Sequence, residues 1–381
     1  MVRRQVGAAL AVLGVASLVY AGAVVKDSAG EETKRRQTTG ATTSTMRVLD
    51  WNVCGESGGC PSAGKTDQQV LLAEQIKNLA VNKNAEAVFL QEVCGDDDKN
   101  DRADDPAKTA DKSLVTHLGE KLGTGWSIAF LPYTRPAESR FGTSTPFAPY
   151  PAPIPTSGST AYPPRSDSTP PYTNPPTTAD FRCRGPERIG VQGIAIAVKG
   201  TFGEREEFEL HSPAPALWLK ALCVRRTSGG TPARLCTSHL TPKADDRDHR
   251  AGFSYRAEQV QRLVEIIGDG QDTIFGGDFN SRPPDDSASG ADSGILAPLY
   301  AKYRECEQGS GTVRKGSGTM WSEPSKGPDP SASPVITRTD RKYDYLFSKS
   351  SFTSCEVLSN AELKAWSDHL PVVGTATVTT G

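Results

Sequence analysis

The 381-residue sequence lacks several features that would each point to a common class of protein. It has no Cys-x-x-Cys pair and no cluster among its five histidines, which argues against a structural zinc site. We find no internal repeat and no dense basic stripe with interleaved aromatic residues. The formal net charge of −2 argues against a polycation that coats nucleic acid nonspecifically, although it leaves room for a local basic groove.

A long apolar run lies at the N-terminus. After "MVRR" come uncharged and mostly apolar residues from Val6 to Val25, and then the charged tract "KDSAGEETKRR". Ala21-Gly22-Ala23 is a suitable cleavage site, which favours an export signal at residues 1–23, while a run of this length can also anchor a protein in a bilayer. Either reading predicts that the body of the protein is secreted or lies outside the cytoplasm. Residues 24–45 are predicted to be a disordered leader, because Thr, Gly and charged residues dominate them.

Eight cysteines in an exported chain predict disulfides. In "LKALCVRRTSGGTPARLCTSHL", Cys223 and Cys236 lie symmetrically about the Gly229–Gly230 bond, so a hairpin closed there would place them opposite each other. A second candidate pair is Cys306 with Cys355, which lie in two further short strand-like runs. The sequence leaves four cysteines unassigned: Cys54, Cys60, Cys94 and Cys183.

Strand-like segments rich in β-branched and aromatic residues recur along the chain. They lie at residues 47–53, 87–93, 126–131, 191–198, 207–210, 217–224, 234–240, 272–277, 343–348 and 371–378. Three amphipathic helices are predicted between them, the first opening with the capping-box pattern Thr66-x-x-Gln69. Their apolar faces carry Leu72, Ile76, Leu79 and Ala80; Leu114, Val115, Leu118 and Leu122; and Val260, Leu263, Val264 and Ile267. This alternation predicts an α+β fold of packed sheets with helices outside.

Residues 132–186 contain fourteen of the chain's 28 prolines, together with Ser, Thr and scattered tyrosines. Such a segment buries too little apolar surface to offset its ordering entropy, so we interpret it as a long insertion loop. The remaining length suits one large domain spanning residues 46–381.

Five motifs at strand ends or beside loops contain polar residues that are candidates for catalysis or metal binding. Asp278 and Asn280 in "GGDFN" are two residues apart, so an extended backbone directs both to one side of a strand end. A polar turn is the alternative for this pair, as it is for Asn52 in "LDWNV", and His239 in "TSHL" could be an ordinary structural histidine. Glu92 in "LQEV" would be partly buried and would need a cation. The last motifs are "KYDYLF" with Asp344 and "SDHLPVV" with Asp368 and His369.

The ordered motifs "WNV", "LQE", "GGDFN" and "SDHLPV" resemble those of the endonuclease/exonuclease/phosphatase superfamily, which includes deoxyribonuclease I-like nucleases and bacterial neutral sphingomyelinases. The resemblance extends from Met46 to about Val378. It implies a four-layer α/β/β/α sandwich with the active site at one end of two sheets. The Pro-rich insertion and the extra cysteines depart from the family pattern and leave the substrate open.

Hydrolysis of a phosphodiester requires positive charge on its oxygens, an activated water and help for the leaving alkoxide. Glu92 and Asn52 are predicted to bind Mg²⁺ through oxygen, with Mn²⁺ or Ca²⁺ as alternatives and Asp368 completing or supporting the shell. Asp278 and Asn280 would orient the water and hold phosphate oxygens. His369 would act as general base or phosphate donor, with Asp344 as its partner by resemblance, and His239 would face the leaving oxygen.

These residues predict a secreted, Mg²⁺-dependent phosphodiesterase, with DNA as the expected substrate and endonucleolytic cleavage as the expected reaction. The alternatives are a phospholipid headgroup or sugar phosphate as substrate and a noncatalytic binding protein on the same scaffold. A lipid-acting member should expose an apolar hairpin, and only "PAPALWLKAL" with Trp218 resembles one. We expect a monomer with no protein partner, and membrane contact only through an uncleaved anchor.

The segment that follows His239 is rich in charge. Lys243, Arg247, Arg250 and Arg256 could contact phosphates, or they could belong to a solvated loop neutralised by Asp245, Asp246 and Asp248. Three histidines match no motif and are interpreted as surface or structural residues: His117, His211 and His249.

Overall fold

The structure is a computed structural model, and it describes residues 42–55, 67–96, 112–133, 183, 190–210, 212, 219–243, 246, 254–286, 294–308, 316–321, 339–359 and 363–380. The predicted export signal, most of the predicted leader and nearly all of the Pro-rich insertion lie outside these ranges. Within them, we find no helix that is long and apolar enough to cross a membrane.

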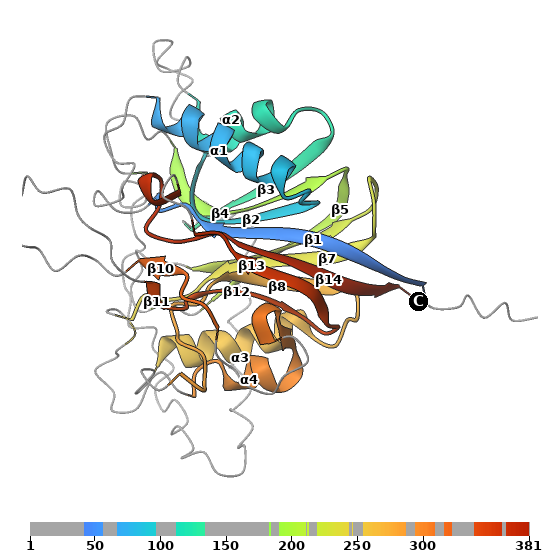
Figure 1. The fold of residues 1–381 in the computed structure, drawn as a ribbon, viewed down its shortest axis with the longest axis vertical. Helices are drawn as coiled ribbons and strands as arrows, with labels where there is room; N and C mark the ends of the chain where they lie inside the picture. The colour runs from blue at the N-terminus through green and yellow to red at the C-terminus, as the bar shows by residue number, and fades with distance from the viewer. Residues whose placement is uncertain are drawn as a thin grey trace, which may run out of the picture. The chain divides into compact units, whose positions relative to one another are not determined.

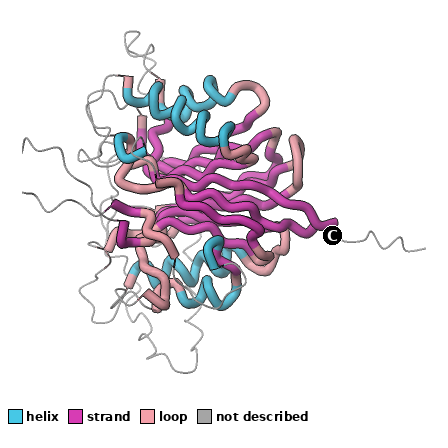
Figure 2. Tube along the Cα trace, in the orientation of Figure 1, coloured by secondary structure: helices cyan, strands magenta, loops and turns pink. Residues whose placement is uncertain are grey.

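Two six-stranded sheets dominate the described part of the chain (Figure 1, Figure 2). The first has the order β13 (Phe352–Val357), β14 (Val372–Thr380), β1 (Thr42–Asn52), β2 (Ala87–Gly95), β4 (Val191–Lys199) and β3 (Trp126–Pro132). The second has the order β5 (Phe202–Glu209), β6 (Lys220–Arg226), β7 (Ala233–His239), β8 (Thr273–Asp278), β12 (Asp344–Ser348) and β9 (Arg304–Glu305). A separate two-stranded sheet pairs β10 (Met320–Trp321) with β11 (Thr339–Arg341).

Helices cover the outer face of each sheet (Figure 1). The first sheet carries α1 (Gln68–Asn82) and α2 (Leu114–Leu122), and the second carries α3 (Tyr255–Ile267) and α4 (Ala297–Lys302). Short 3₁₀ turns, η3 (Cys306–Gln308) and η4 (Leu363–Ala365), lie before β10 and β14. The predicted four-layer α/β/β/α arrangement of an α+β protein is therefore confirmed.

Successive side chains of β1 point to opposite faces of the sheet, so this strand contributes residues to two hydrophobic cores. Val48 belongs to the core between the sheets, whereas Leu49 and Trp51 pack in the core that includes α1 and α2. The period of two places Asp50 and Asn52 on the same face as Val48, toward the second sheet. A strand with apolar residues on both faces thus ends with polar side chains between the sheets.

The predicted helix faces are buried or half-buried, and one helix start differs from the sequence pattern. α1 follows Asp67, which has a φ of 54° and makes no side-chain cap bond, while Thr66 of the predicted capping box lies outside the described residues. α2 and α3 begin after Ser113 and Ser254, whose side chains accept from the N–H groups of Thr116 and Ala257. The short helix α4 was not predicted.

Strand pairing extends the domain slightly beyond the predicted boundary. β1 starts at Thr42, inside the predicted leader, because its antiparallel ladder with β14 begins at the Thr42–Thr380 pair.

The strands β10 and β11 were not predicted, since each is too short to show a periodic pattern. Cys355 lies in β13 as expected, while Cys306 starts the turn η3 directly after β9.

Two parallel strand pairs bring the functional motifs to one edge. β1 runs parallel to β2, and β7 runs parallel to β8 with His239 opposite Asp278. β12 runs antiparallel to β8 and begins where β8 ends, with Asp344 opposite Asp278. The carboxyl ends of four strands and the start of a fifth therefore meet at the edge on the left of Figure 1.

Disulfides join segments within and between these strands. The predicted pairs Cys223–Cys236 and Cys306–Cys355 are both confirmed. A third bond joins Cys94, near the end of β2, to Cys183, and Cys54 is disulfide-bonded as well. Cys183 lies near the end of the Pro-rich insertion (residues 132–186), so this bond ties that end of the insertion to β2.

The two disulfides with the most different loop lengths should differ in their effect on stability. The sequence separations are 89 residues for Cys94–Cys183 and 13 for Cys223–Cys236. By loop entropy, C94A/C183A should lower the free energy of unfolding by about 4–5 kcal/mol and C223A/C236A by about 3 kcal/mol. Denaturant titration under oxidising conditions measures both, and equal losses would contradict the prediction.

Candidate active site

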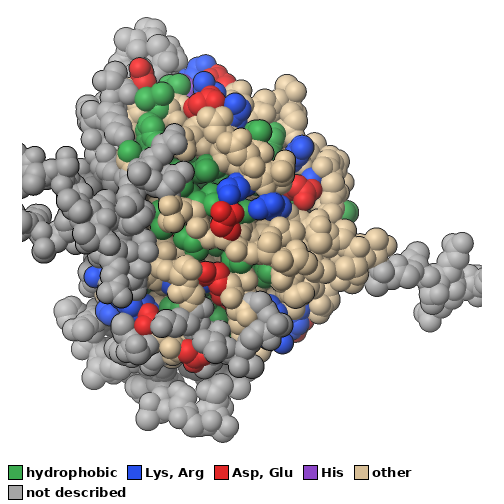
Figure 3. Space-filling view, viewed as in Figure 1, with side chains coloured by type: hydrophobic (Ala, Val, Ile, Leu, Met, Phe, Trp, Pro, Cys, Tyr) green, Lys and Arg blue, Asp and Glu red, His purple; other side chains and the backbone are tan. Residues whose placement is uncertain are grey.

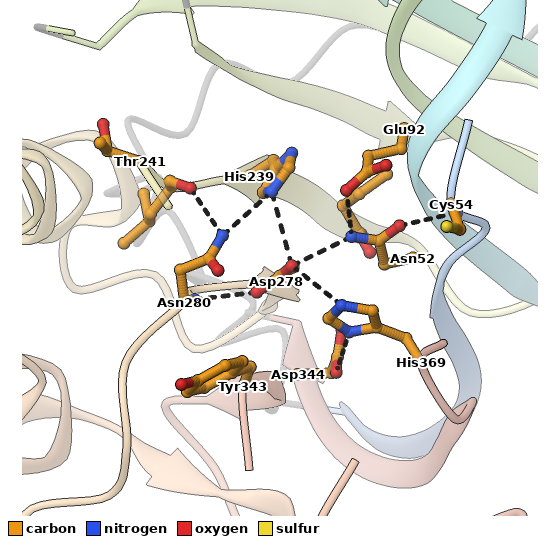
Figure 4. A network of polar contacts seen from close by, with 12 residues as sticks. Asn52, Cys54, Glu92, His239, Thr241, Asp278, Asn280, Tyr343, Asp344 and His369 are labelled. Atoms are coloured by element: carbon orange, nitrogen blue, oxygen red, sulfur yellow. Dashed lines mark hydrogen bonds and ion pairs between the residues drawn. The ribbon is translucent and has the colours of Figure 1, made fainter. Parts of the chain in front are cut away.

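The carboxylate of Asp278 lies at the centre of a polar cluster at the shared strand edge (Figure 4). Its Oδ1 accepts the backbone N–H of Asn280 at 2.8 Å, and its Oδ2 accepts Asn52 Nδ2 at 3.0 Å. The Nε2 atoms of His239 and His369 lie 3.4 and 3.7 Å from the same Oδ2. One buried carboxylate thus contacts groups from β1 and β7, from the residues that follow β8 and from the segment before β14.

Electrostatics keep this carboxylate ionised. Burial opposes ionisation, but the charge of His369 and the hydrogen bond and charge of His239 outweigh it and lower the pKa of Asp278 below its ordinary value. Asp278 is therefore an acceptor at neutral pH and offers negative charge to a cation or a water proton.

His369 and Asp344 form a close buried pair. His369 Nδ1 lies 2.8 Å from Asp344 Oδ2. Burial acts against the charged ring, yet the carboxylates of Asp344 and Asp278 raise the pKa of His369 well above its ordinary value. Burial likewise raises the pKa of Asp344 to about 6, against the lowering effect of His369. With Nδ1 held by Asp344, Nε2 is the ring nitrogen that faces Asp278.

Two hydroxyl side chains that sequence reasoning missed hold this pair in place. Thr319 Oγ1 accepts the N–H of Asp344 at 3.0 Å and also that of Tyr343. Ser367 Oγ accepts the N–H of His369 at 3.0 Å and donates to the carbonyl of Asn52 at 2.7 Å. Ser367 lies two residues before His369 in "WSDHLPV", so the motif itself contained this signal. Thr319 had no such signal because its contact is made across the fold.

A β-bulge directs Glu92 into the site. The pairing of β2 with β4 shifts register between Leu90 and Val93, and Glu92 within the bulge has a φ of 52°. Glu92 Oε1 accepts Asn52 Nδ2 at 2.9 Å. Gly55 makes room for the bulge, because a Cβ there would lie 1.8 Å from the Glu92 carbonyl oxygen.

Asn52 connects Glu92 to Asp278 through its side-chain nitrogen. Its oxygen accepts the N–H of Cys54 at 2.9 Å, which determines the orientation of the amide. A carbonyl oxygen has two lone pairs, so this bond leaves one available. The role of Asn52 as an oxygen ligand stays a prediction, while its role as a bridge between the two carboxylates is observed.

Asn280 and His239 contact each other on the opposite side of Asp278 (Figure 4). Asn280 Nδ2 lies 3.1 Å from His239 Nε2 and donates to the carbonyl of Leu240 at 2.9 Å. Asn280 has a φ of 47°, a left-handed conformation that Asn tolerates better than most residues. This conformation lets its N–H reach back to Asp278 while its side chain reaches β7.

The donor set suits a hard divalent cation. Ligand atoms of Glu92, His239 and Asp278 lie within 4.8 Å of one another, and so do those of Asp278, Asp344 and His369. Each group combines carboxylate oxygens with an imidazole nitrogen, and both atom types bind divalent metal ions. Among the described residues, Asp368 belongs to neither group; it is half-buried, and its charge contributes to the raised pKa of His369. Its place in a metal shell stays a prediction.

Arg256 differs from both sequence-based readings. It is neither a phosphate contact nor part of a solvated loop, because it is buried with only 2% of its surface exposed. Its Nη2 pairs with Asp246 at 3.1 Å, and its Nη1 donates to Ser281 Oγ at 3.1 Å and to the carbonyl of Asn280. Arg256 therefore holds the backbone beyond Asp278. Lys243 is exposed, and Arg247, Arg250, Asp245 and Asp248 lie outside the described residues.

A buried polar layer lies between the sheets beneath the site. Gln91 Nε2 donates to Asp50 Oδ1 at 2.8 Å and to Thr237 Oγ1 at 2.9 Å, which links β1 and β2 to β7. Burial and the charge of Asp344 raise the pKa of Asp50 well above its ordinary value. Sequence reasoning missed Asp50, although its position two residues before Asn52 indicated the same face.

The remaining sequence candidates lie elsewhere. His117 is on α2 with its Nδ1 3.8 Å from Glu120, and His211, His249 and Trp218 lie outside the described residues. On the face shown in Figure 3, basic and acidic side chains are interspersed.

Comparison with known proteins agrees with the fold. A model of the Endonuclease/Exonuclease/phosphatase family matches residues 51–369. An endonuclease/exonuclease/phosphatase from Beutenbergia cavernae DSM 12333 has a similar structure, with a TM-score of 0.50 and 15% identity over 88% of this chain and 72% of that one. A family protein from Leptotrichia buccalis C-1013-b is similar at TM-score 0.49 and 13% identity, covering 86% of this chain and 98% of that one.

A third similar structure is D. rerio TDP2 complexed with single strand DNA product, at TM-score 0.48 and 16% identity over 89% of this chain and 100% of that one. No curated protein matches the sequence. At these identities the structural likeness concerns the fold alone.

The Asp344→Asn substitution should lower the pKa of His369. It keeps the shape of the side chain but removes the carboxylate that contributes most to raising that pKa, so the ring should lose its proton at a lower pH. An NMR titration of the His369 ring measures the change. Asp368→Asn is the control, because Asp368 contributes less and should give a smaller fall. An equal fall in both variants would contradict the prediction.

Proposed function

The chain belongs to the Endonuclease/Exonuclease/phosphatase family, and we propose that it is a metal-dependent phosphodiesterase that cleaves DNA endonucleolytically. One observation carries the proposal. The ionised carboxylate of Asp278 lies within hydrogen-bonding or ion-pair distance of His239 and His369, and its ligand atoms group with those of Glu92 within 4.8 Å. Hydrolysis of a phosphodiester requires acid, base and cation-binding groups close together in this way.

Glu92 would hold the cation, with Asn52 contributing its free lone pair and Asp368 supporting the shell. When bound, Mg²⁺ supplies positive charge beside the phosphate oxygens, and Mn²⁺ or Ca²⁺ could take its place. Asn52 Nδ2 bridges Glu92 and Asp278, so it keeps the two carboxylates at a defined separation.

The remaining residues act on the water and the phosphate. Asp278 and Asn280 would orient the attacking water and contact phosphate oxygens. His369, oriented by Asp344 through Nδ1, presents Nε2 toward Asp278, where it would take a proton from the water or donate one to a phosphate oxygen. His239 presents Nε2 to the same carboxylate from β7 and would serve the leaving oxygen.

DNA as substrate is proposed from the motif order, which resembles that of the deoxyribonuclease I-like members of the superfamily. Export is proposed from the N-terminal sequence together with the disulfides. Bonds such as Cys94–Cys183 and Cys223–Cys236 form and persist in oxidising compartments. A secreted nuclease would act where such bonds are stable.

Nicking of supercoiled plasmid by the purified, oxidised protein tests the proposal. With Mg²⁺ we expect nicked and then linear DNA, and with chelator no cleavage. Asp278→Asn should reduce the rate by at least about 100-fold, because the ionised acceptor is lost without a change in size. Asp272→Asn is a matched control, since Asp272 lies at the opposite end of β8 and pairs with Arg225.

A folded, oxidised protein that nicks no DNA with Mg²⁺, Mn²⁺ or Ca²⁺ would contradict the DNA assignment. Hydrolysis of sphingomyelin or of a small aryl phosphodiester, lost in Asp278→Asn, would then indicate another phosphodiester substrate. Activity equal in Asp278→Asn and in the unsubstituted protein would contradict the assigned site itself.

A further inference from the structure

Tyr133 lies against the site but belongs to none of the motifs that identify it. It follows β3, is fully buried, and is the second residue of the Pro-rich insertion (residues 132–186). Its backbone N–H donates to the carbonyl of Gln192 at 3.0 Å, which extends the pairing of β3 with β4 by one residue. The backbone of Tyr133 is therefore fixed by the sheet, and its hydroxyl lies between the backbone of Glu92 and the ring of His239.

That hydroxyl meets the bulge in β2. Between Leu90 and Val93 the ladder with β4 loses its register, so the N–H of Glu92 no longer faces a ladder carbonyl. Tyr133 Oη accepts this N–H at 3.3 Å. A buried N–H needs an acceptor, and the phenol oxygen supplies one at the position where the bulge turns Glu92 into the site.

The same hydroxyl lies 2.9 Å from His239 Nδ1, and the two rings are 5.9 Å apart between centroids at an angle of 50°. The other ring nitrogen, Nε2, lies 3.1 Å from Asn280 Nδ2. Asn280 Nδ2 also donates to the carbonyl of Leu240 at 2.9 Å, which identifies this atom as the amide nitrogen.

These contacts select one tautomer of neutral His239. An amide nitrogen only donates, so in the neutral ring Nε2 accepts from Asn280 and the ring proton lies on Nδ1. In the charged ring, which is the form that lowers the pKa of Asp278, Nε2 carries a proton as well, so Nδ1–H is present in both forms. Nδ1–H donates to Tyr133 Oη. A phenol oxygen can accept two hydrogen bonds, here from His239 and from the backbone of Glu92.

We propose that Tyr133 is a positioning residue for His239: its hydroxyl holds the Nδ1–H tautomer and directs Nε2 at Asp278 and the reacting phosphate. The hydroxyl contacts both the ring of His239 on β7 and the backbone N–H of Glu92 on β2. One side chain therefore helps to fix the orientation of a residue from each sheet. The expected effect on kcat rests on the proposed phosphodiesterase activity, whereas the expected tautomer of the His239 ring does not depend on that activity.

Tyr133→Phe tests the proposal, because it removes the hydroxyl and keeps the buried ring. The first readout needs no activity. In protein labelled with ¹⁵N-histidine, five ring systems are observed, and the unsubstituted protein should show His239 as a single Nδ1–H tautomer. In Tyr133→Phe the His239 ring signals should move toward a tautomer mixture, while those of His117 stay unchanged. His239→Gln assigns the His239 signals.

The second readout is kinetic. Tyr133→Phe should reduce kcat about 10- to 100-fold with KM unchanged, as expected for loss of an orienting partner. In a His239→Ala background the same substitution should reduce kcat by a smaller factor than in the unsubstituted protein, because the part of its effect that passes through His239 is lost and only the contact with the Glu92 N–H remains. A purely structural role would make the two losses multiply. Tyr303→Phe is the matched control: Tyr303 is a buried tyrosine whose hydroxyl donates to the carbonyl of Gly268 at 2.8 Å, and it should leave kcat unchanged.

The outcomes separate this proposal from the proposed function. A tautomer mixture for His239 in the unsubstituted protein, or ring signals identical in Tyr133→Phe, overturns the positioning role whatever the activity. Losses that multiply in the His239→Ala background overturn it as well. The expected ring change in a protein that hydrolyses no phosphodiester would support the positioning role and overturn the proposed reaction instead.

Discussion

The site depends on the burial of one ionised carboxylate. Asp278 is 1% exposed, and a carboxylate removed from water to this extent stays charged only where donors and positive charge replace its hydration. The donors come from both sheets: Asn52 from the first, His239 and Asn280 from the second. The environment of Asp278 is therefore complete only where the two sheets pack together.

The backbone around this carboxylate adopts uncommon conformations where side chains must be directed. Glu92 and Asn280 both have positive φ, and in each case the surrounding structure supports the strained residue. The Glu92 N–H reaches the hydroxyl of Tyr133, and the Asn280 carbonyl accepts from the buried Arg256. Tyr133 and Arg256, which lie outside the recognisable motifs, thus help to hold the backbone of Glu92 and Asn280 in the conformations that direct their side chains into the site.

The sequence by itself determined most of the longer strands, the faces of the three longer helices and the order of the motifs, because these follow from short-range regularities. The short strands β10 and β11 and the short helix α4 gave no such signal. A period of 3.6 identified the buried faces of α1, α2 and α3. The prediction that strand alternation directs both Asp278 and Asn280 to one side holds only for the end of β8 at Asp278, because Asn280 follows the strand in a left-handed conformation with a φ of 47°. Cys223–Cys236 was predictable because a hairpin converts symmetry about a turn into a contact. With family resemblance, the same signals indicated a four-layer fold and a site at one edge.

Only the tertiary structure decided contacts between segments that no local rule connects. The bond Cys94–Cys183 spans the Pro-rich insertion, and Tyr133 reaches His239 across the two sheets. The sequence allowed Arg256 to contact phosphate or to belong to a solvated loop, but the structure buries it on α3 against Asp246. Periodicity specifies which face a side chain occupies on its own element. The partner on that face depends on how the elements pack, which is a property of the whole chain.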